Sequence, residues 1–319
     1  MIGGRSIAVR AQCAPAVLMI RPAHFGFNAQ TAASNRFQRH PGGASTAESA
    51  GREFTALARA LESAGVGTCV IEDTADPIKP DAVFPNNWVS FHDDGTVVLY
   101  PMQAVNRRLE RRLDALAAVA RELRFCCRHL LDLSAEEQRG RYLEGTGSLV
   151  LDHIGRVAYA CRSPRTDESL AREWAQAMHY DIEIFDAVGA DGTPIYHTNV
   201  MLAIGARCAV LCSEAVAARD RERIRTRLRD GDRALIEIGY AAMSEFAANV
   251  LELRTPAAAG AAQSLLVLSS RARAAFEPAQ LARIGEGVDR ILEVSIPTVE
   301  TVGGGGVRCM LAEVPEQRA

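Results

Sequence analysis

The sequence predicts an α/β fold built from five similar units that close into a ring. An apolar hairpin, a polar amphipathic helix and a short strand follow one another in that order, with a repeat of about 60 residues. An apolar segment near the end of the chain, residues 306–314, has no partner nearby in sequence, and neither does the early segment 16–22. Pairing of these two segments would let every unit bury its apolar face against two neighbours.

The first two complete units follow this pattern closely. The hairpin over residues 86–102 turns at Asp94-Gly95, a strong hairpin signal. A second hairpin over residues 144–163 turns at His153 to Arg156. In the first unit we expect a helix over residues 105–123 and a strand over residues 125–133 after the hairpin. In the second unit we expect a helix over residues 167–178 and a strand over residues 182–188.

The remaining units repeat the order. The third has its hairpin at 197–216, helix at 218–230 and strand at 234–238. The fourth unit is looser: its hairpin joins residues 249–255 to 264–270, and a helix over 277–287 and a strand over 291–296 follow. The segment 16–22, a helix over 48–64 and a strand over 67–73 complete the fifth unit with residues 306–314. We therefore expect one catalytic domain over residues 16–315, after an N-terminal extension over residues 1–15 whose order the sequence leaves open.

The composition excludes several partners. The 319 residues are 48% hydrophobic and carry a net charge of only -3, so the chain has a large core and no electrostatic footprint for nucleic acid. No apolar run approaches the roughly 18 residues of a membrane span. We expect a cytosolic protein that acts on a small molecule, and the sequence leaves a homo-oligomer open.

Eight cysteines are scattered along the chain, and seven have ordinary surroundings. Most are expected to be reduced and buried. Cys208 and Cys212 have no histidine or acidic partners at metal-ligand spacing, so a structural zinc is not expected. Nor is a catalytic metal or an organic cofactor expected, since thiol, imidazole and carboxylate groups can together perform every proton and bond change in a hydrolysis. Cys309 differs because four glycines, Gly303 to Gly306, precede it between two apolar segments that read as strands. Glycines let backbone or ligand approach closely, which suits a nucleophile at the floor of a pocket.

Polar residues stand at the start of every predicted hairpin. Since these starts converge on the axis of the ring, they are expected to line a central pocket. They are Phe84 to Trp88, Glu144 to Ser148, His197 to Asn199, Glu245 to Asn249 and Gly303 to Cys309.

Three of these motifs, Glu144-Gly, His197-Thr-Asn199 and the glycine run up to Cys309, occur in an order that resembles the guanidine-modifying superfamily. The resemblance covers about residues 17–313 and implies a five-bladed α/β propeller, the pentein fold, with pseudo-fivefold ββαβ units. Arginine deiminases, dimethylargininases and amidinotransferases belong to this superfamily. The segments AVFPNNWVSFH and ACRSPRTDE look most like the bacterial citrulline-utilisation hydrolases, often labelled amidinotransferase.

The resemblance implies that Cys309 is the nucleophile, His197 the general acid and base, and Glu144 the carboxylate that holds the substrate's nitrogens. The chemistry of these residue types agrees. A nearby imidazolium favours the thiolate, histidine can protonate departing ammonia near neutral pH, and a carboxylate can fix a planar group by accepting its N–H bonds.

Two departures from the superfamily bear on the substrate. Arginine-processing members usually clamp the guanidinium with two further aspartates, and the matching positions here are Asn87 and Asn199. A buried cation without its counter-charges is strongly disfavoured, whereas an asparagine amide can donate to the oxygen of a neutral ureido group. The pair therefore favours citrulline over arginine.

The rest of an amino-acid substrate needs anchors for its charged ends. Arg165 matches the superfamily arginine that binds the α-carboxylate, Asp81 is placed to meet the α-ammonium, and Phe84 is expected to line the same pocket. Asn249 is a pocket candidate by its position in the repeat, and Arg308 is a candidate for lowering the pKa of Cys309.

The sequence thus predicts a hydrolase of carbon–nitrogen bonds other than peptide bonds, which converts L-citrulline to ornithine, ammonia and carbon dioxide through a thiol adduct. Within the superfamily, the alternatives are an arginine deiminase or dihydrolase and an amidinotransferase. An alternative of another class is a propeller that only binds a partner and performs no thiol chemistry.

Overall fold

The computed structural model describes residues 7–9, 11–40, 46–230, 233–255 and 262–318. Their strands form five three-stranded sheets, in the orders β15-β1-β2, β3-β4-β5, β6-β7-β8, β11-β10-β9 and β12-β13-β14. In every sheet the middle strand is antiparallel to one neighbour and parallel to the other. This shared pairing is the repeat that the sequence predicts.

The strands are short, from three to seven residues. Their bounds are β1 Ala16–Arg21, β2 Gly67–Glu72, β3 Val89–Phe91, β4 Thr96–Leu99, β5 His129–Asp132, β6 Val150–Asp152, β7 Val157–Cys161, β8 Asp181–Phe185, β9 Leu202–Ile204, β10 Cys208–Leu211, β11 Ala234–Glu237, β12 Leu251–Thr255, β13 Gln263–Ser269, β14 Arg290–Val294 and β15 Ala312–Val314.

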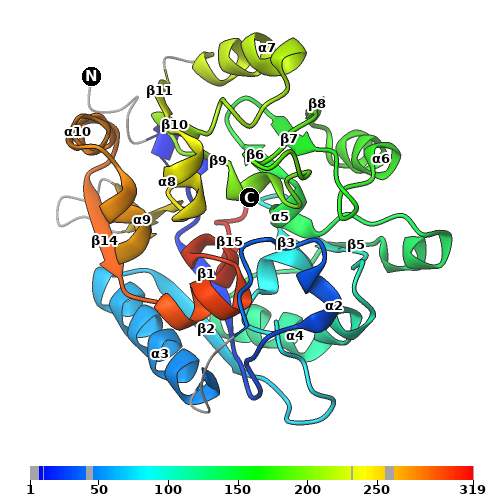
Figure 1. The fold of residues 1–319 in the computed structure, drawn as a ribbon. Helices are drawn as coiled ribbons and strands as arrows, with labels where there is room; N and C mark the ends of the chain where they lie inside the picture. Colours follow the sequence, from blue (N-terminus) through cyan, green and yellow to red (C-terminus); the bar gives the residue numbers. More distant parts are fainter. Residues whose placement is uncertain (1–6, 10, 41–45, 231–232, 256–261, 319) are drawn as a thin grey trace.

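The longer helices lie at the periphery and the first strands of the hairpins nearer the middle (Figure 1). These helices are α3 Thr46–Ala64, α4 Leu113–Glu122, α6 Glu168–Met178, α7 Ala218–Arg229 and α10 Pro278–Gly287. Shorter helices are α2 Ala29–Ala32, α5 Gly145–Ser148, α8 Tyr240–Ser244 and α9 Ser270–Ala275. Single turns or pairs of turns are η1 Pro85–Asn87, η2 Val105–Glu110, η3 Ser134–Arg139, η4 Thr198–Val200, η5 Val299–Gly303 and η6 Val307–Met310.

The two ends of the chain share one sheet, as predicted. Strand β15 pairs antiparallel with β1, with Ala16 opposite Val314 and Leu18 opposite Ala312, and β1 pairs in parallel with β2. Residues 16–21 therefore stand between segments from both ends of the sequence, so the fifth unit is completed only when the whole chain has folded.

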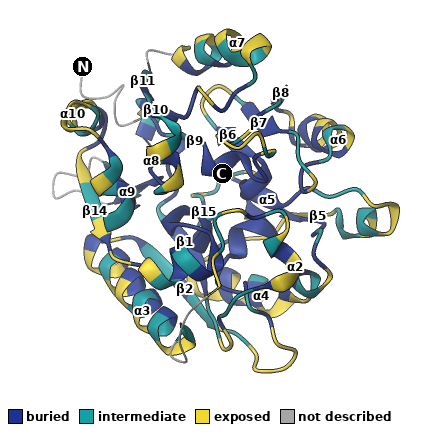
Figure 2. Ribbon diagram, viewed as in Figure 1, coloured by how far each residue is buried: buried dark blue, intermediate teal, exposed yellow. Residues whose placement is uncertain are grey.

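Each peripheral helix packs through one apolar stripe and exposes its other face (Figure 2). In α3 the stripe includes Phe54, Leu57 and Leu61, all fully buried at helical spacing. Helix α6 begins where Asp167, its N-cap, accepts a hydrogen bond from the backbone N–H of Leu170. The helices predicted at 48–64, 167–178, 218–230 and 277–287 all form.

Three predicted segments differ from the structure. The helix expected over 105–123 is broken, because Arg111 and Arg112 are extended between η2 and α4. The strand expected over 125–133 is reduced to His129–Asp132, and Cys126 and Cys127 before it are exposed rather than buried. No strand covers residues 306–311, since residues 307–310 form the turn η6.

Part of the N-terminal extension packs against the body of the protein. The side chain of Gln12 is buried and donates to the carbonyl oxygens of Leu151 and Ile204 at 3.0 and 3.2 Å. It also accepts from the N–H of His153 at 2.9 Å. Residues 1–6 of the extension lie outside the described residues.

Candidate active site

Short helical turns, rather than strands, open the hairpins at the centre of the molecule, and these turns contact one another. Thr146 of α5 donates to the carbonyl oxygen of Asn86 in η1 at 3.3 Å, and Thr198 of η4 donates to that of Ser148 at 2.6 Å. Gly145 has a φ of +48° and a Cβ there would lie 2.2 Å from the Asn86 oxygen, so only glycine fits. A turn at each hairpin start therefore brings side chains from distant segments together.

A small cavity of about 10 Å³ lies among these turns. Of the site residues predicted from the sequence, six line it and two stand directly behind it. The lining residues are Asp81, Phe84, Asn87, Arg165, His197 and Cys309, and those behind are Glu144, bonded to His197, and Asn199, in contact with Cys309.

His197 and Glu144 form a buried hydrogen-bonded pair, with His197 Nε2 2.9 Å from Glu144 Oε2. Burial lowers the pKa of His197 to about 4, although Glu144 acts in the opposite direction. The histidine is therefore neutral at pH 7, in contrast to the imidazolium expected from the sequence, because desolvation outweighs its carboxylate partner. Since an ionised carboxylate only accepts, Nε2 carries the proton and Nδ1 keeps its lone pair.

Glu144 is fully buried, and protein groups occupy both of its oxygens. Besides His197, Oε1 accepts from the N–H of Gln103 at 3.0 Å, and Oε2 lies 3.4 Å from Arg165 and 3.8 Å from Arg107. Burial by itself raises the pKa of Glu144, but Arg165 and His197 lower it below the usual range. Glu144 is thus an ionised carboxylate whose first task in this structure is to orient the imidazole of His197.

Cys309 lies on η6 with 5% of its surface exposed, and amides contact its sulfur. Asn249 Nδ2 is 3.3 Å and Asn199 Nδ2 3.6 Å from Sγ. Burial raises the pKa of the Cys309 thiol, and its contact with Asn249 is the largest opposing influence. Arg308 points elsewhere, since its guanidinium donates to Leu311 and Glu313, although its charge still acts to lower that pKa.

Asn87 is held in one orientation by Arg107. The guanidinium of Arg107 donates to Asn87 Oδ1 at 2.9 Å, and because arginine has no acceptor, the atom facing it must be the amide oxygen. Asn87 Nδ2 is buried and has no hydrogen-bond partner, and the same is true of Asn199 Oδ1. The site therefore holds one unpaired amide donor and one unpaired amide acceptor, both on residues that adjoin the cavity or its nucleophile.

Asp81 lines the same cavity as Cys309. Its Oδ2 accepts from Asn28 at 2.7 Å, whereas its buried Oδ1 has no hydrogen-bond partner. Burial raises the pKa of Asp81, opposed by Arg107 3.7 Å away and by the hydrogen bond from Asn28. An unpaired carboxylate oxygen in this position is suited to a cationic ligand group.

The segment around α2 covers the cavity. Arg165 donates to the carbonyl oxygen of Thr31 at 3.1 Å and to Ser34 Oγ at 2.7 Å, and Asn35 donates to the carbonyl oxygens of Gly303 and Gly304 at 3.3 and 3.2 Å. Gly304 has a φ of +64°, and a Cβ there would lie 2.7 Å from Asn35 and Gln38. The glycine run thus lets this segment lie directly on the cavity wall.

Sequence reasoning missed Arg107, which is buried and lines the cavity. It forms a paired hydrogen bond with Glu110, at 2.9 and 2.8 Å. The segment from 107 to 112 contains four arginines, and inside a predicted amphipathic helix nothing distinguishes the one that turns inward. Tyr196 and Asn35 also line the cavity without having been predicted.

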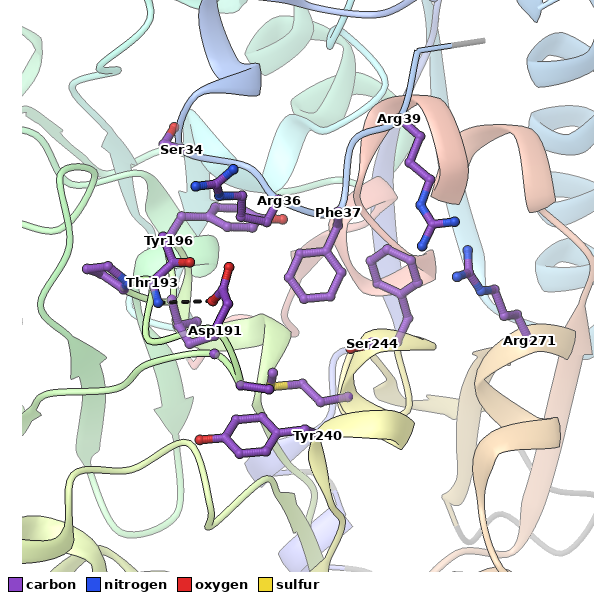
Figure 3. A pocket seen from close by; sticks show the side chains of 16 residues that line it. Ser34, Arg36, Phe37, Arg39, Asp191, Thr193, Tyr196, Tyr240, Ser244 and Arg271 are labelled. Carbon is purple, nitrogen blue, oxygen red and sulfur yellow. Dashed lines mark hydrogen bonds between the residues drawn. The ribbon is translucent and has the colours of Figure 1, made fainter. Parts of the chain in front are cut away.

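A larger cavity of about 240 Å³ is lined in part by residues 34–39 of the chain (Figure 3). Phe37 stands between Tyr196 and Phe246 in its wall, with ring centroids 6.1 and 5.3 Å apart. Arg39 and Arg271 stand together on one side of it, as the figure shows. The side chains of Cys309, His197 and Glu144 do not line this cavity.

Within the described residues, no group of three or more His, Cys, Asp or Glu side chains is arranged to hold a metal ion. In the same part of the chain, no helix is both long and apolar enough to cross a bilayer.

Comparison with known families supplies the relationship. The family described as N,N dimethylarginine dimethylhydrolase, eukaryotic, matches residues 21–316, nearly the whole chain. The chain belongs to this family. It is a member of the guanidine-modifying pentein superfamily, as its motifs predicted, and its homologues include hydrolases acting on carbon–nitrogen bonds.

Solved structures share the fold of this dimethylarginine dimethylhydrolase family member at low sequence identity. The N-terminal domain of ArgZ, an arginine dihydrolase from cyanobacteria, is 15% identical, with a TM-score of 0.70 over 94% of this chain and 98% of that one. Unliganded AgrE is 17% identical with a TM-score of 0.72, and the match spans 95% of this chain but 40% of AgrE. A dimethylarginine dimethylaminohydrolase, as its adduct with S-methyl-L-thiocitrulline, is 17% identical with a TM-score of 0.61, over 93% of this chain and 98% of that one. A search among curated proteins found no match.

Proposed function

We propose that the protein is a cysteine-dependent hydrolase of the ureido group of L-citrulline, and that its five sheets are the blades of one closed propeller. The observation that carries the choice of substrate is the orientation of Asn87. Arg107 fixes its amide oxygen, so the free Nδ2 presents a donor. A ureido group has a carbonyl oxygen to accept from that donor, whereas a guanidinium has only N–H groups and would be repelled.

Local charge supports the same choice. Glu144 is the carboxylate beside the catalytic histidine, and it lies within 4 Å of both Arg165 and Arg107. The negative charge of Glu144 is therefore already paired with guanidinium groups of the protein, so a cationic head group gains little from it. Asn199 Oδ1, unpaired and buried, is available to accept from a ureido N–H.

The reaction then uses the groups already described. As the Cys309 sulfur attacks the ureido carbon, its proton passes to the lone pair of His197 Nδ1, and the imidazolium formed gives that proton to the leaving nitrogen, releasing ammonia. The adduct is an S-linked N-alkyl thiocarbamate. Water, deprotonated by His197, attacks the same carbon and expels the thiolate, which recovers its proton. The resulting carbamic acid loses carbon dioxide to give ornithine.

The two charged groups on the α-carbon of the amino acid have separate anchors in this proposal. Arg165 and Arg107 offer guanidinium donors for the α-carboxylate, and the free Oδ1 of Asp81 accepts from the α-ammonium. Phe84 packs against the glycine run and walls the aliphatic part of the substrate. Glu144 acts through His197 by fixing the tautomer that leaves Nδ1 unprotonated.

Hydrolysis of arginine, either by deimination or by two successive hydrolyses, is the second candidate, and one observation favours it. Across the whole site, three buried carboxylates, Asp81, Glu110 and Glu144, face two buried arginines, Arg107 and Arg165. If all three are ionised, a cationic substrate would balance the excess charge. Solved relatives include an arginine dihydrolase and AgrE bound to L-arginine. Because burial raises the pKa of Glu110 to about 7, protonation of this one carboxyl group balances the charge without a cationic substrate, and citrulline remains our proposal.

The deciding experiment measures ammonia and ornithine released from citrulline, arginine, agmatine, N-carbamoylputrescine and methylated arginines by the purified protein. We expect kcat/KM for citrulline to exceed that for arginine by at least about tenfold, the discrimination of a mispaired hydrogen-bond donor. Equal values, or a preference for arginine, would contradict the proposal. A partner-binding protein without thiol chemistry would release no ammonia from any of them, and its Cys309 would react with chloroacetamidine equally fast with and without citrulline.

A further inference from the structure

Asn249 has a set of contacts that the proposed reaction has not yet used. It precedes β12, the first strand of the hairpin β12–β13, and is 1% exposed. Both polar atoms of its amide contact the sulfur of Cys309. Nδ2 lies 3.3 Å and Oδ1 3.5 Å from Sγ. No other side chain among the described residues makes two hydrogen-bonding contacts with this sulfur.

The amide orientation is settled by a second partner. Nδ2 donates to the backbone carbonyl oxygen of Asn199 at 2.9 Å, and because a carbonyl only accepts, the atom facing it must be the nitrogen. One N–H of the amide is thereby occupied, and the other faces the sulfur. Oδ1 can accept from the S–H of the thiol, and Nδ2 can donate to the thiolate, so the same side chain pairs with both protonation states of Cys309.

The surrounding backbone is shaped to hold this amide. A Cβ at Gly306 would lie 2.8 Å from Asn249 Oδ1, so the last glycine before η6 leaves the space that the amide fills. The N–H of Asn249 donates to the carbonyl oxygen of Phe246 at 2.8 Å, closing a turn in which Phe246 has a φ of +63°. A bulky residue in the left-handed region costs free energy, and such conformations persist where the surroundings require them.

The other polar side chains near Cys309 pair less closely with its sulfur. The hydrogen bond of His197 goes to Glu144, and the described residues contain no hydrogen bond between His197 and Cys309. Asn199 Nδ2 is farther from the sulfur, at 3.6 Å. Because His197 is neutral, it provides no positive charge to stabilise a thiolate before substrate binds.

We infer that Asn249 is a positioning residue that stabilises the Cys309 thiolate by donating an amide N–H to its sulfur, with Asn199 as a weaker second donor. This inference deepens the proposed hydrolase function and rests on it only for the identity of the nucleophile. Ionisation of the thiol is an equilibrium of the free protein, so it can be measured without any substrate.

The test follows alkylation of Cys309 by chloroacetamidine as a function of pH, using mass spectrometry of the peptide that contains it. In Asn249→Leu we expect the midpoint of the rate profile to rise by one pH unit or more, so that labelling at pH 7 falls about tenfold, because a hydrogen bond to a charged group is lost. Asn249→Ser keeps a donor of shorter reach and should fall between the wild type and Asn249→Leu. Asn249→Asp, which cannot donate when ionised, should shift the midpoint at least as far as Asn249→Leu.

The matched control is Gln12→Met, which removes another buried amide that donates to backbone carbonyls, far from the site. It should lower the temperature of unfolding and leave the labelling midpoint unchanged. An unchanged midpoint in folded Asn249→Leu overturns the inference. If Asn249→Leu does not fold, unchanged midpoints in Asn249→Ser and Asn249→Asp overturn the inference instead. Failure of the citrulline assay with a shifted midpoint would reject the substrate and keep the role of Asn249.

Discussion

Two cavities of about 10 Å³ each in this protein are lined by one buried cysteine, and they differ in the polar group beside the sulfur. Cys309 faces the amides of Asn249 and Asn199. Cys208, at the start of β10, shares its cavity with Glu252, whose Oε2 accepts from the N–H of Ala206 at 3.0 Å. Both thiols are shielded from water, so the neighbouring group decides their chemistry.

The polar groups beside the two sulfurs act on thiol ionisation in opposite directions. Burial raises the pKa of Cys208 to about 12, and the charge of Glu252 acts in the same direction. Burial also raises the pKa of Cys309, but there the hydrogen bond with Asn249 acts against it. A carboxylate repels a thiolate while an amide N–H binds it, so of these two cavities the one around Cys309 is better suited to a thiolate.

The largest expected effect comes from replacing each sulfur in turn. Cys309→Ser should lower kcat/KM for the preferred substrate by at least about 1,000-fold, because a hydroxyl without strong activation is a far weaker nucleophile than a thiolate. Cys208→Ser should leave kcat/KM within about threefold of the wild type. Steady-state assays of ammonia release on the two folded variants measure both. A comparable loss in Cys208→Ser would remove the distinction between the cavities.

Removing the base should separate proton transfer from thiol ionisation. In His197→Asn we expect kcat/KM to fall by about 10²- to 10⁴-fold, the usual contribution of a general acid and base. The labelling midpoint of Cys309 should move less than in Asn249→Leu, since His197 is neutral and not bonded to the sulfur. If instead the midpoint rises more in His197→Asn, an imidazolium–thiolate pair exists and the pKa assigned to His197 is wrong.

Exchanging amides for carboxylates at the cavity should change the substrate. The double variant Asn87→Asp, Asn199→Asp restores the two negative charges that clamp a guanidinium, and its ratio of kcat/KM for arginine over citrulline should rise at least about tenfold. Gln176→Glu provides the control, because it adds a negative charge at an exposed position of α6 outside the cavity lining. Kinetics with both substrates measure the ratio. An equal rise in the control, or none in the double variant, would contradict the proposed reading of the two amides.

The pH dependence of labelling should distinguish the two cysteines within one sample. At pH 9 we expect alkylation of Cys309 to proceed while Cys208, with its pKa raised to about 12, remains almost unmodified in the folded protein. The exposed Cys126 and Cys127 serve as internal standards for reagent activity. Peptide mass spectrometry at a series of pH values gives all four rates. Equal midpoints for Cys208 and Cys309 would show that burial alone controls both thiols.

The smallest expected effect concerns the carboxyl group beside Cys208. Burial raises the pKa of Glu252 above its unfolded value, so the folded protein holds a proton that the unfolded chain releases as pH rises. The stability that depends on this proton is complete below pH 4.5 and is lost as pH rises toward the folded pKa. Glu252→Gln removes that loss. The free energy of unfolding of Glu252→Gln, measured by urea denaturation, should therefore rise relative to that of the wild type between pH 4.5 and pH 7. A fall relative to the wild type would contradict this expectation.

Periodicity in the sequence was enough to predict the repeated units, because each sheet and helix exposes one face and buries the other. The pairing of residues 16–22 with 306–314 followed from two apolar segments without local partners, and β1 and β15 confirm it. The helix over 105–123 failed for a tertiary reason. Arg107 turns inward to Glu110 and Asn87, and residues 111 and 112 extend to reconnect the chain.

The candidate site was predictable to the extent that its residues share one place in the repeat. His197, Glu144 and Cys309 were found at hairpin starts, and all lie at or behind one cavity. The charge state of His197 was not predictable, because it depends on the depth of burial. Arg107 and Asn35 were missed because neither stands at a hairpin start, and the contacts that bring them to the cavity join segments far apart in sequence.

In the proposed reaction, the segment of residues 28–38 that covers the cavity would limit the rate of turnover. A space of about 10 Å³ accommodates roughly one water molecule, so no amino acid enters while Arg165 remains bonded to Ser34 and Asn35 to the glycine run. Each catalytic cycle has to part and remake these contacts, and a product held by the same groups leaves at the rate of that opening. Turnover in the proposed reaction would then slow in proportion to solvent viscosity.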